Sequence, residues 1–569
     1  MTDAGPAAHD EARSPAALPA FALVLVSLVG FLPSSQRPAL TVGIVAALAG
    51  TAFGLPLLVG LFRGGETTAR LGAGFALWCV VAAAASGAPL AWTGEYQSAT
   101  GAVFCLAMVA FWALGRSLPA SVVPMVAAGF LAGAAINAAV AVLQRLVDLS
   151  AMDVYLFDDR STGLLGNPVF LGACCATAVA LLPMLARKSL PGALALAVLL
   201  GAGTQMSGAR NSLVVLGVAG LWSAWRCGTR RGAALLVALA VGLAAGGALQ
   251  GNTETAGARL QSTTGVGPRL DNWGAGIGAA FDRPLTGVGP GRWRAATSPR
   301  RTLALARMGP DRLYADAHDL PVEYLATTGF VGAGLLMAWL GALALALRRG
   351  ARPELAAAAL ALLAFHALEP QHVTLTPLML LLAGAAVTRR DDAASSKATT
   401  AVQAVLVVVV LVLGARIVVG DLLFRSGELD FALDRTEQAS RLLWPWPNSV
   451  VTEGRIHAYQ ARTQKDPREL VAALDAARRA RRLEPENPLR SIAVASFLGQ
   501  LGRHDEAVRE FGQALELNPW SQQAFNGRAE SLVALGLDNQ ARACRTATQL
   551  DARPDDALRA ARRRCLMAA

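Results

Sequence analysis

The sequence contains little charge for its length. Charged residues occupy 16% of the 569 positions, and 54% of the residues are hydrophobic, whereas a soluble globular chain carries roughly 25% charge. This deficit excludes a soluble protein with a single hydrophobic anchor and predicts an all-α protein that crosses the membrane many times. The net charge of +11 is therefore assigned to membrane-protein loops, and no nucleic-acid partner is expected.

Several common motifs are also absent. None of the seven cysteines belongs to a Cys-x-x-Cys pair, so neither a zinc site nor a redox motif is predicted. No Gly-Lys-Ser or Gly-Lys-Thr is present to make a P-loop. The first 15 residues are polar and of mixed charge, and no cleavable signal peptide is expected. Cys544 and Cys565 share the polar C-terminal region and could pair, but we expect two free thiols.

Long apolar runs are abundant, and most approach the roughly 20 residues that a bilayer core requires. Three of them (190–206, 211–225 and 354–368) are shorter. We predict about 12–13 membrane spans in a helical bundle. The runs lie near residues 17–34, 39–62, 71–92, 99–115, 119–143, 167–186, 190–206, 211–225, 232–249, 320–347, 354–368, 373–388 and 400–423.

Lysine and arginine occupy every second turn between these runs, as expected of turns that stay in the cytoplasm. This alternation places residues 1–16 in the cytoplasm and the loops 144–166 and 250–319 outside. The prediction is a transmembrane domain over 17–424, with 250–319 as a large outer loop, followed by an outer domain over 425–569. The basic turns contain Arg63 and Arg70, Arg116, Arg187 and Lys188, Arg226, Arg230 and Arg231, Arg348, Arg349 and Arg352, and Arg389, Arg390 and Lys397.

The predicted outer loop 250–319 is far longer than an ordinary connection. A long loop without secondary structure is usually functional. The loop contains residues 269–273 (RLDNW) and then a glycine cluster at 284–291 (PLTGVGPG). Glycines permit tight turns and close approach of the backbone, and we interpret this cluster as a structural turn rather than a phosphate cradle.

The predicted outer domain is charged and helical in period. Residues 483–488 (LEPENP) are followed 34 positions later by 517–519 (LNP). This spacing resembles the tetratricopeptide repeat family over about 425–560. The resemblance implies stacked helical hairpins and a surface for an envelope protein.

One imidazole stands where the outer loop meets the next apolar run. His318 has a carboxylate on each side, Asp316 and Asp319. Because histidine titrates near neutral pH, it can carry a proton in catalysis. The alternative is a polar residue near a helix N-cap. We expect Asp319 to raise the pKa of His318.

Four arginines stand out on the predicted outer side: Arg160, Arg210, Arg269 and Arg292. An arginine at the bilayer edge is costly unless it is paired or hydrated. The alternative role is snorkelling to lipid phosphates. Guanidinium groups bind phosphate oxygens in a bidentate manner and can stabilise a pyrophosphate leaving group. With His318 they predict glycosyl transfer from a pyrophosphate-bearing lipid.

Two other polar groups are given lesser roles. Asp158 and Asp159 form a close carboxylate pair in the outer loop 144–166, without a nearby histidine, and we expect no metal there. His366, Glu369 and His372 are interpreted as a hydrated loop near the outer surface rather than a proton path.

The membrane part resembles the O-antigen ligase family of bacterial envelope glycosyltransferases, which includes O-antigen polymerases and protein O-oligosaccharyltransferases. Four segments carry the resemblance over about 15–425. They are 160–168 (RSTGLLGNP), 207–212 (SGARNS), 282–291 (DRPLTGVGPG), and His318 followed by Gly329 and Gly332.

The resemblance implies a cofactor-free, metal-independent transferase of the multi-spanning C type in the bacterial inner membrane. Its donor would be a glycan on undecaprenyl pyrophosphate, and its acceptor a glycan, lipid A-core or a protein. His318 resembles the family's base, and Arg210 and Arg269 its pyrophosphate-binding arginines. Arg160 is a further candidate.

This sequence departs from the family pattern at two places. The family commonly has Ser before the arginine and Asn after the histidine, where this chain has Ala209 and Asp319. A ligase is the favoured reading. The alternatives are a polymerase that extends a lipid-linked repeat unit, a transferase to protein, and a non-enzymatic scaffold or transporter.

Overall fold

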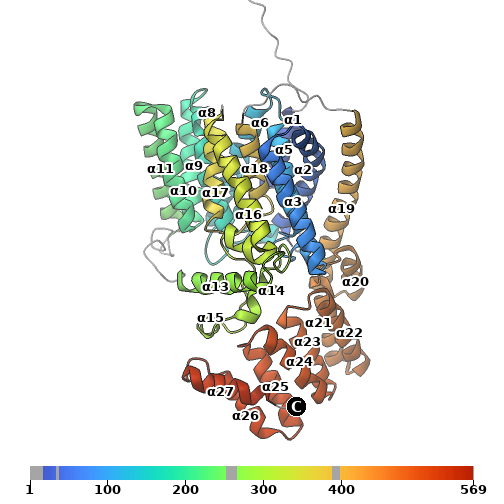
Figure 1. Cartoon of the computed structure of the whole chain (residues 1–569). Helices are drawn as coiled ribbons and strands as arrows, with labels where there is room; N and C mark the ends of the chain where they lie inside the picture. The colour runs from blue at the N-terminus through green and yellow to red at the C-terminus, as the bar shows by residue number, and fades with distance from the viewer. Residues whose placement is uncertain (1–16, 34–36, 251–265, 351, 388–396, 568–569) are drawn as a thin grey trace, which may run out of the picture.

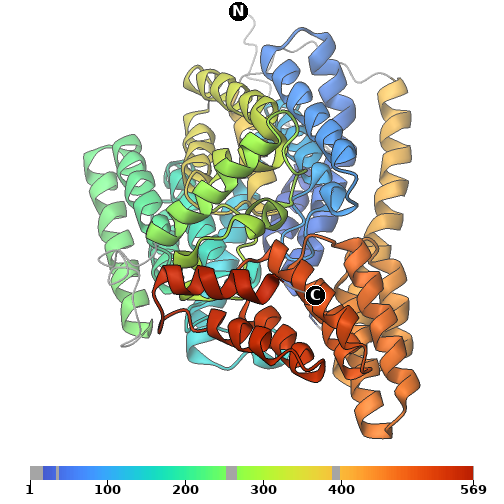
Figure 2. The ribbon, with the colours of Figure 1, turned by 60° about the horizontal axis from the view of Figure 1, so that its bottom comes forward.

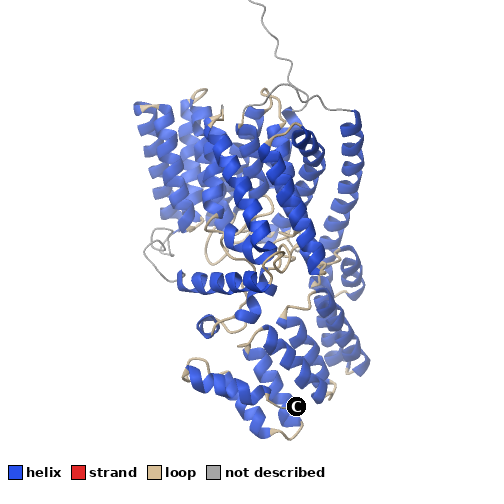
Figure 3. Ribbon diagram, in the orientation of Figure 1, coloured by secondary structure: helices blue, strands red, loops and turns tan. Residues whose placement is uncertain are grey.

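The computed structural model describes residues 17–33, 37–250, 266–350, 352–387 and 397–567. Every regular element among them is a helix (Figure 3), so the all-α prediction is confirmed. The predicted tail 1–16 and the basic residues Arg389 and Arg390 lie outside the described residues.

Each predicted apolar run coincides with one helix or with consecutive helices of the membrane part (Figure 1). This includes the three short runs, which form α9, α10 and α17. The helices are α1 (Ala17–Val29), α2 (Pro38–Arg63), α3 (Thr67–Ser86), α4 (Leu90–Thr93), α5 (Ala102–Arg116), α6 (Val123–Leu146), η1 (Ser150–Met152), η2 (Gly163–Leu165), α7 (Pro168–Ala178), η3 (Val179–Leu181), α8 (Leu182–Ala186), α9 (Leu190–Met206), α10 (Arg210–Cys227), α11 (Thr229–Gln250), α16 (Leu320–Arg348), α17 (Pro353–His366), α18 (Leu375–Ala386) and α19 (Lys397–Asp430).

Within the described ranges, seven helices are long and apolar enough to cross a membrane. Shorter apolar helices, among them α5, α9 and α18, pack between them. The helix α19 stands apart from the bundle (Figures 1 and 2) and contacts mainly α2 and α20. Its Val405, Leu411 and Val412 are more than 60% exposed, as expected of a helix surrounded by lipid. The chain is therefore a polytopic helical membrane protein.

The predicted basic turns meet at one end of the bundle. Glu354, at the start of α17, contacts Arg187 and also Arg226 (Oε1 to Nη2, 3.1 Å). Glu66 Oε1 likewise accepts from an arginine, Arg116 Nε (3.1 Å). The turns that the sequence assigns to one side thus share one end of the structure.

The opposite end, which we call the site face, carries the segment 266–319. The prediction of a loop without secondary structure is wrong here, because this segment contains α13 (Val266–Asp282), α14 (Trp293–Thr297), η4 (Ser298–Arg300) and α15 (Leu303–Met308). Helix α13 lies across the end of the bundle (Figure 1).

The glycine cluster 284–291 is a structural turn, as predicted. It packs against a break in α16 at Gly329 (φ +71°). Gly289 N donates to Thr327 O (2.9 Å), and Phe330 N donates to Pro284 O (2.8 Å). A Cβ on Gly329 would lie 2.3 Å from Leu285 O, so only glycine fits this break.

The C-terminal region continues from α19 as a chain of helices, each packed on the next. Side-chain caps from Asp466, Asn487 and Ser521 begin three of them, as polar N-cap residues commonly do. These helices are α20 (Leu433–Leu442), α21 (Asn448–Gln464), α22 (Pro467–Leu483), α23 (Pro488–Gln500), α24 (His504–Leu517), α25 (Gln522–Ala534), α26 (Asp538–Ala547) and α27 (Asp555–Leu566).

These C-terminal helices are docked on the site face (Figure 2). Trp520 packs with Leu303 of α15 in a small apolar cluster. Arg307 Nη2 pairs with Asp555 Oδ1 (2.7 Å), and Trp446 Nε1 donates to Gly94 O (3.0 Å). The C-terminal region therefore contacts both the segment 266–319 and the loop between α4 and α5.

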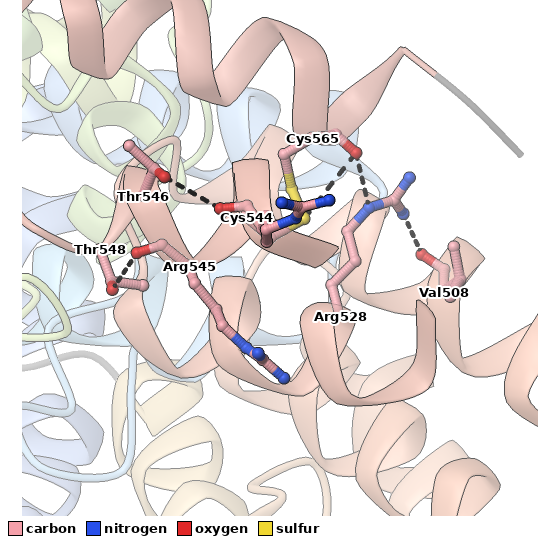
Figure 4. Close-up of a disulfide and its surroundings, with 8 residues drawn as sticks. Val508, Arg528, Cys544, Arg545, Thr546, Thr548 and Cys565 are labelled. Atoms are coloured by element: carbon pink, nitrogen blue, oxygen red, sulfur yellow. Dashed lines mark hydrogen bonds between the residues drawn. A yellow bond between two sulfur atoms is a disulfide. The ribbon is translucent and has the colours of Figure 1, made fainter. Parts of the chain in front are cut away.

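The prediction of free thiols at Cys544 and Cys565 is wrong. The two form a disulfide that joins α26 to α27 (Figure 4). Arg528 lies beside the disulfide and donates to the carbonyls of Cys565 and Val508. Spacing along the chain could not reveal the pairing, because it depends on α27 folding back over α26.

Candidate active site

His318 lies in a turn held by a neighbouring carboxylate. Its backbone has φ +54°, and its N–H donates to Asp316 Oδ1 (2.9 Å). The same carboxylate oxygen contacts the ring nitrogen Nδ1. Because Nδ1 is thus engaged, Nε2 is the nitrogen available to exchange a proton with a substrate.

Groups from two helices fix this turn. Ala317 N donates to Glu323 Oε2 of α16 (2.8 Å). From α13, Trp273 Nε1 donates to Ala317 O (2.7 Å) and Asn272 Nδ2 donates to Asp316 O (3.2 Å). The segment 269–273 singled out in the sequence therefore positions His318.

The sequence predicted Asp319 as the carboxylate that acts on His318, and this prediction is wrong. Asp319 is the N-cap of α16, and its Oδ1 accepts from Val322 N (2.8 Å). The carboxylate beside the ring is Asp316. Burial lowers the pKa of His318, but the hydrogen bond and the charge of Asp316, aided by Glu369, outweigh it, so the pKa is raised above 6.5. Burial also raises the pKa of Asp319.

Glu369 joins the other predicted groups to this turn. Its Oε1 accepts from Asn211 Nδ2 (2.6 Å) and from Arg269 Nη2 (3.3 Å). Arg269 Nη1 also donates to Leu368 O (3.1 Å). Glu369 is 8% exposed and lines the same cleft as His318. Helix α10, helix α13 and the loop between α17 and α18 thus converge at one carboxylate.

The structure brings two of the other predicted arginines, Arg210 and Arg160, close to each other. Arg210 is the first residue of α10 and precedes Asn211. The aliphatic part of Arg160 packs on Gly208, where a Cβ would lie 2.8 Å from Arg160 Cδ. Ser161 N also donates to Met206 O (3.1 Å). Arg160 therefore lies against the turn that presents Arg210, while His318 and Arg269 approach from α16 and α13.

The cleft at His318 is narrow, about 20 Å³ in volume. Two polar residues of the loop between α4 and α5, Ser98 and Thr100, face it, and no sequence motif marked them. The lining is Ser98, Thr100, Asp316, His318, Asp319, Leu320, Glu323, Glu369, Pro370 and Gln371.

The interpretation of His366, Glu369 and His372 as a hydrated loop is wrong, because all three are buried. His366 Nδ1 bonds to Pro370 O (3.0 Å) and its Nε2 to Thr376 Oγ1 (3.2 Å). The two histidines fix the loop that presents Glu369. In the sequence, Glu369 stands out only as an acidic residue between two histidines, because its partners lie in distant segments.

Two other candidates have structural partners. Arg292 is buried, donates to Val288 O (2.7 Å) and contacts Glu486, so it joins the glycine cluster to the C-terminal region. Asp159 pairs with Arg145 (3.0 Å), and Asp158 lies 4.0 Å from Arg160. The carboxylate pair is thus matched with arginines.

Comparison with known proteins bears on this geometry. Residues 195–337 match the family model described as O-Antigen ligase. The matched segment contains Arg210, Arg269 and His318, and it ends before Glu369. A search of curated proteins finds no match. The family match supports glycan transfer of the O-antigen ligase type, with a lipid-linked glycan and an acceptor as substrates in a membrane.

Proposed function

We propose that this protein transfers a glycan from an undecaprenyl-pyrophosphate donor to an acceptor at the outer face of the bacterial inner membrane, as an O-antigen ligase does. The observation that carries the proposal is the convergence at Glu369. This carboxylate holds Arg269 and the residue after Arg210, and it lines the cleft of His318. One guanidinium and a titratable imidazole thus lie beside one carboxylate, and Arg210 begins the helix whose second residue bonds to it.

The arginines would bind the donor pyrophosphate. A guanidinium remains charged at any relevant pH and matches phosphate oxygens in pairs. Arg269 is about one-third exposed while it is held by Glu369, so its outer N–H groups can meet an anion. Arg210, with Arg160 packed beside its turn, approaches from α10. Their positive charge would stabilise the pyrophosphate as it leaves, and no metal ion is required for that role.

His318 would act as the base. Its Nε2 accepts the proton of the acceptor hydroxyl while that oxygen forms a bond to the anomeric carbon of the donor sugar. The bond between the anomeric carbon and the pyrophosphate oxygen breaks, and its electron pair leaves with undecaprenyl pyrophosphate. Asp316 would orient the ring and stabilise the imidazolium that forms.

An apolar cavity of about 230 Å³ supports a lipid-linked substrate. It lies between α2, α5 and α19, beside the exposed apolar face of α19. Ala99 lines this cavity, and its neighbours Ser98 and Thr100 line the His318 cleft. A hydrocarbon chain held there would leave its polar head near the cleft. The other lining residues include Ile44, Ala47, Leu48, Val103, Phe104, Ala107, Leu413 and Ile417.

Two observations support an outer location for the site face. The basic turns gather at the opposite end, as cytoplasmic turns do, and the disulfide Cys544–Cys565 lies in the C-terminal region, as expected in an oxidising compartment. We place the C-terminal domain, 425–569, in the periplasm. Its helical hairpins are proposed to be tetratricopeptide-like repeats that bind an envelope protein.

Docking of the C-terminal helices on the site face favours a second candidate, a protein acceptor. An O-antigen or exopolysaccharide polymerase would use the same chemistry with a lipid-linked repeat unit as acceptor. A non-enzymatic scaffold would need no intact His318. Accumulated full-length glycan on the lipid in a deletion strain would indicate a ligase, and single repeat units would indicate a polymerase.

The test compares the His318→Ala variant with a control, His504→Ala. The control removes a histidine from α24 that does not line the His318 cleft. We expect His318→Ala to abolish surface glycan while its expression and membrane insertion stay normal. His504→Ala should keep wild-type transfer. Normal glycan in the His318→Ala strain would refute the proposed enzyme.

A further inference from the structure

The first helices of the C-terminal region bring together three side chains with metal-binding chemistry. Glu437 comes from α20, and Glu453 and His457 come from α21. One ligand atom of each lies within 4.8 Å of the other two. Glu453 and His457 are four residues apart, so they share one face of α21. No other such group occurs among the residues that the structure describes.

Each of the two residues on α21 is oriented by a second partner. His457 Nδ1 bonds to Glu469 Oε2 of α22 (2.6 Å), which leaves the lone pair on Nε2. Glu453 Oε1 contacts Arg479 of α22. A carboxylate behind a ligating histidine, and a hydrogen bond behind a ligating carboxylate, are the usual surroundings of protein metal ligands.

The second oxygen of Glu453 has no partner. Its side chain is 4% exposed, and Oε2 is buried without a hydrogen bond among the described residues. A buried carboxylate oxygen without a partner is costly. A cation coordinated at Oε2 would remove that cost.

We propose that Glu437, Glu453 and His457 bind one first-row divalent cation, with Zn²⁺ the best fit. One imidazole and two carboxylates suit Zn²⁺ and disfavour Mg²⁺ and Ca²⁺, which take oxygen ligands only. The ligand atoms would close to about 3.3 Å apart around a tetrahedral ion with bonds of about 2.0–2.1 Å. Glu437 and Glu453 line an open concavity of about 750 Å³, which would admit the ion and a fourth ligand, water.

The ion would stabilise the packing of the C-terminal helices next to the membrane helix α19. Helix α20 packs on α19 and on α21, and the ligands join α20 to α21, with α22 behind them. Arg441, Arg479 and Arg482 line the same concavity, and their charge opposes a cation. Glu437, Glu453 and Glu469 offset this charge. None of these residues lines the His318 cleft, so the inference does not depend on the proposed function.

The experiment uses the full-length protein, purified in detergent, stripped with chelator and titrated with Zn²⁺. We expect one equivalent of bound Zn²⁺ by elemental analysis after gel filtration, and a melting temperature that rises with Zn²⁺ but not with Mg²⁺. His457→Ala should lose the equivalent and the shift. Glu469→Gln should weaken binding about 10–100-fold, as changes behind a metal ligand do.

His504→Ala is the matched control, because it removes a C-terminal histidine that is not in the group and should bind Zn²⁺ as the wild type does. Circular dichroism establishes that each variant is folded. Absence of a stoichiometric ion in the wild type would overturn the proposal. Zn²⁺ binding that persists in both His457→Ala and Glu437→Gln would also overturn it.

Discussion

Replacement of Glu369 by Gln tests the convergence on which the site depends. The change keeps the size of the side chain and removes its charge. Glu369 holds Arg269 Nη2 and Asn211 Nδ2, and a hydrogen bond to a charged group contributes about 1.5–3 kcal/mol. The Arg269 side chain is 36% exposed, so solvent screening puts that pair at the lower end. Asn211 can still bond to the glutamine.

We therefore expect a net loss of about 1.5 kcal/mol in the positioning of Arg269 and the α10 turn. At about 1.4 kcal/mol per tenfold change, kcat/KM for the donor should fall about 10-fold. The assay is glycan transfer from purified lipid-linked donor in proteoliposomes, with donor concentration varied.

Glu354→Gln provides the control. Glu354 is also buried, and it contacts two arginines, Arg187 and Arg226, at the opposite end of the bundle. Both variants lose a buried ion pair, so both should lose some thermal stability. Only Glu369→Gln should show the fall in kcat/KM for the donor. Equal kcat/KM values in the two variants would refute the role of Glu369.

Three further changes give distinct readouts. Because Asp316 raises the pKa of His318, Asp316→Asn should lower that pKa. In a pH–rate profile, the rise of activity with pH should therefore occur at lower pH than in the wild type. A rise at the same or a higher pH would contradict this. Ala47→Phe should narrow the apolar cavity and raise KM for lipid-linked substrate, whereas Leu411→Phe on the exposed face of α19 should not; equal KM values would argue against a lipid chain there. Cys544→Ser should cost about 2–4 kcal/mol of stability in the C-terminal region, read as earlier proteolysis of that region; unchanged proteolysis would speak against the disulfide.

The bundle could be predicted because hydropathy and basic turns are local signals. A run of apolar residues identifies a membrane span without reference to any other part of the chain, and the long helices of the membrane part follow those runs. Helix α13 was missed even though its apolar residues Leu270, Trp273 and Ile277 recur at helical spacing. The surrounding polar and glycine-rich sequence hid that period.

The candidate site was predictable only in part. His318 and Arg269 stand out by chemistry and position. The role of Glu369 depends on two residues more than 90 positions earlier in the chain, and the sequence alone places it merely near two histidines. Asp316 and Asp319 flank His318 symmetrically in sequence, and only the turn geometry shows which one contacts the ring and which one caps α16.

The central claim is that His318 and Arg269 together perform glycan transfer. The most direct measurement compares wild-type, His318→Ala and Arg269→Ala proteins in proteoliposomes with purified undecaprenyl-pyrophosphate-linked glycan and acceptor. Loss of transfer in both variants is predicted, with donor binding retained in His318→Ala and weakened in Arg269→Ala. Wild-type transfer by the His318→Ala protein would contradict it.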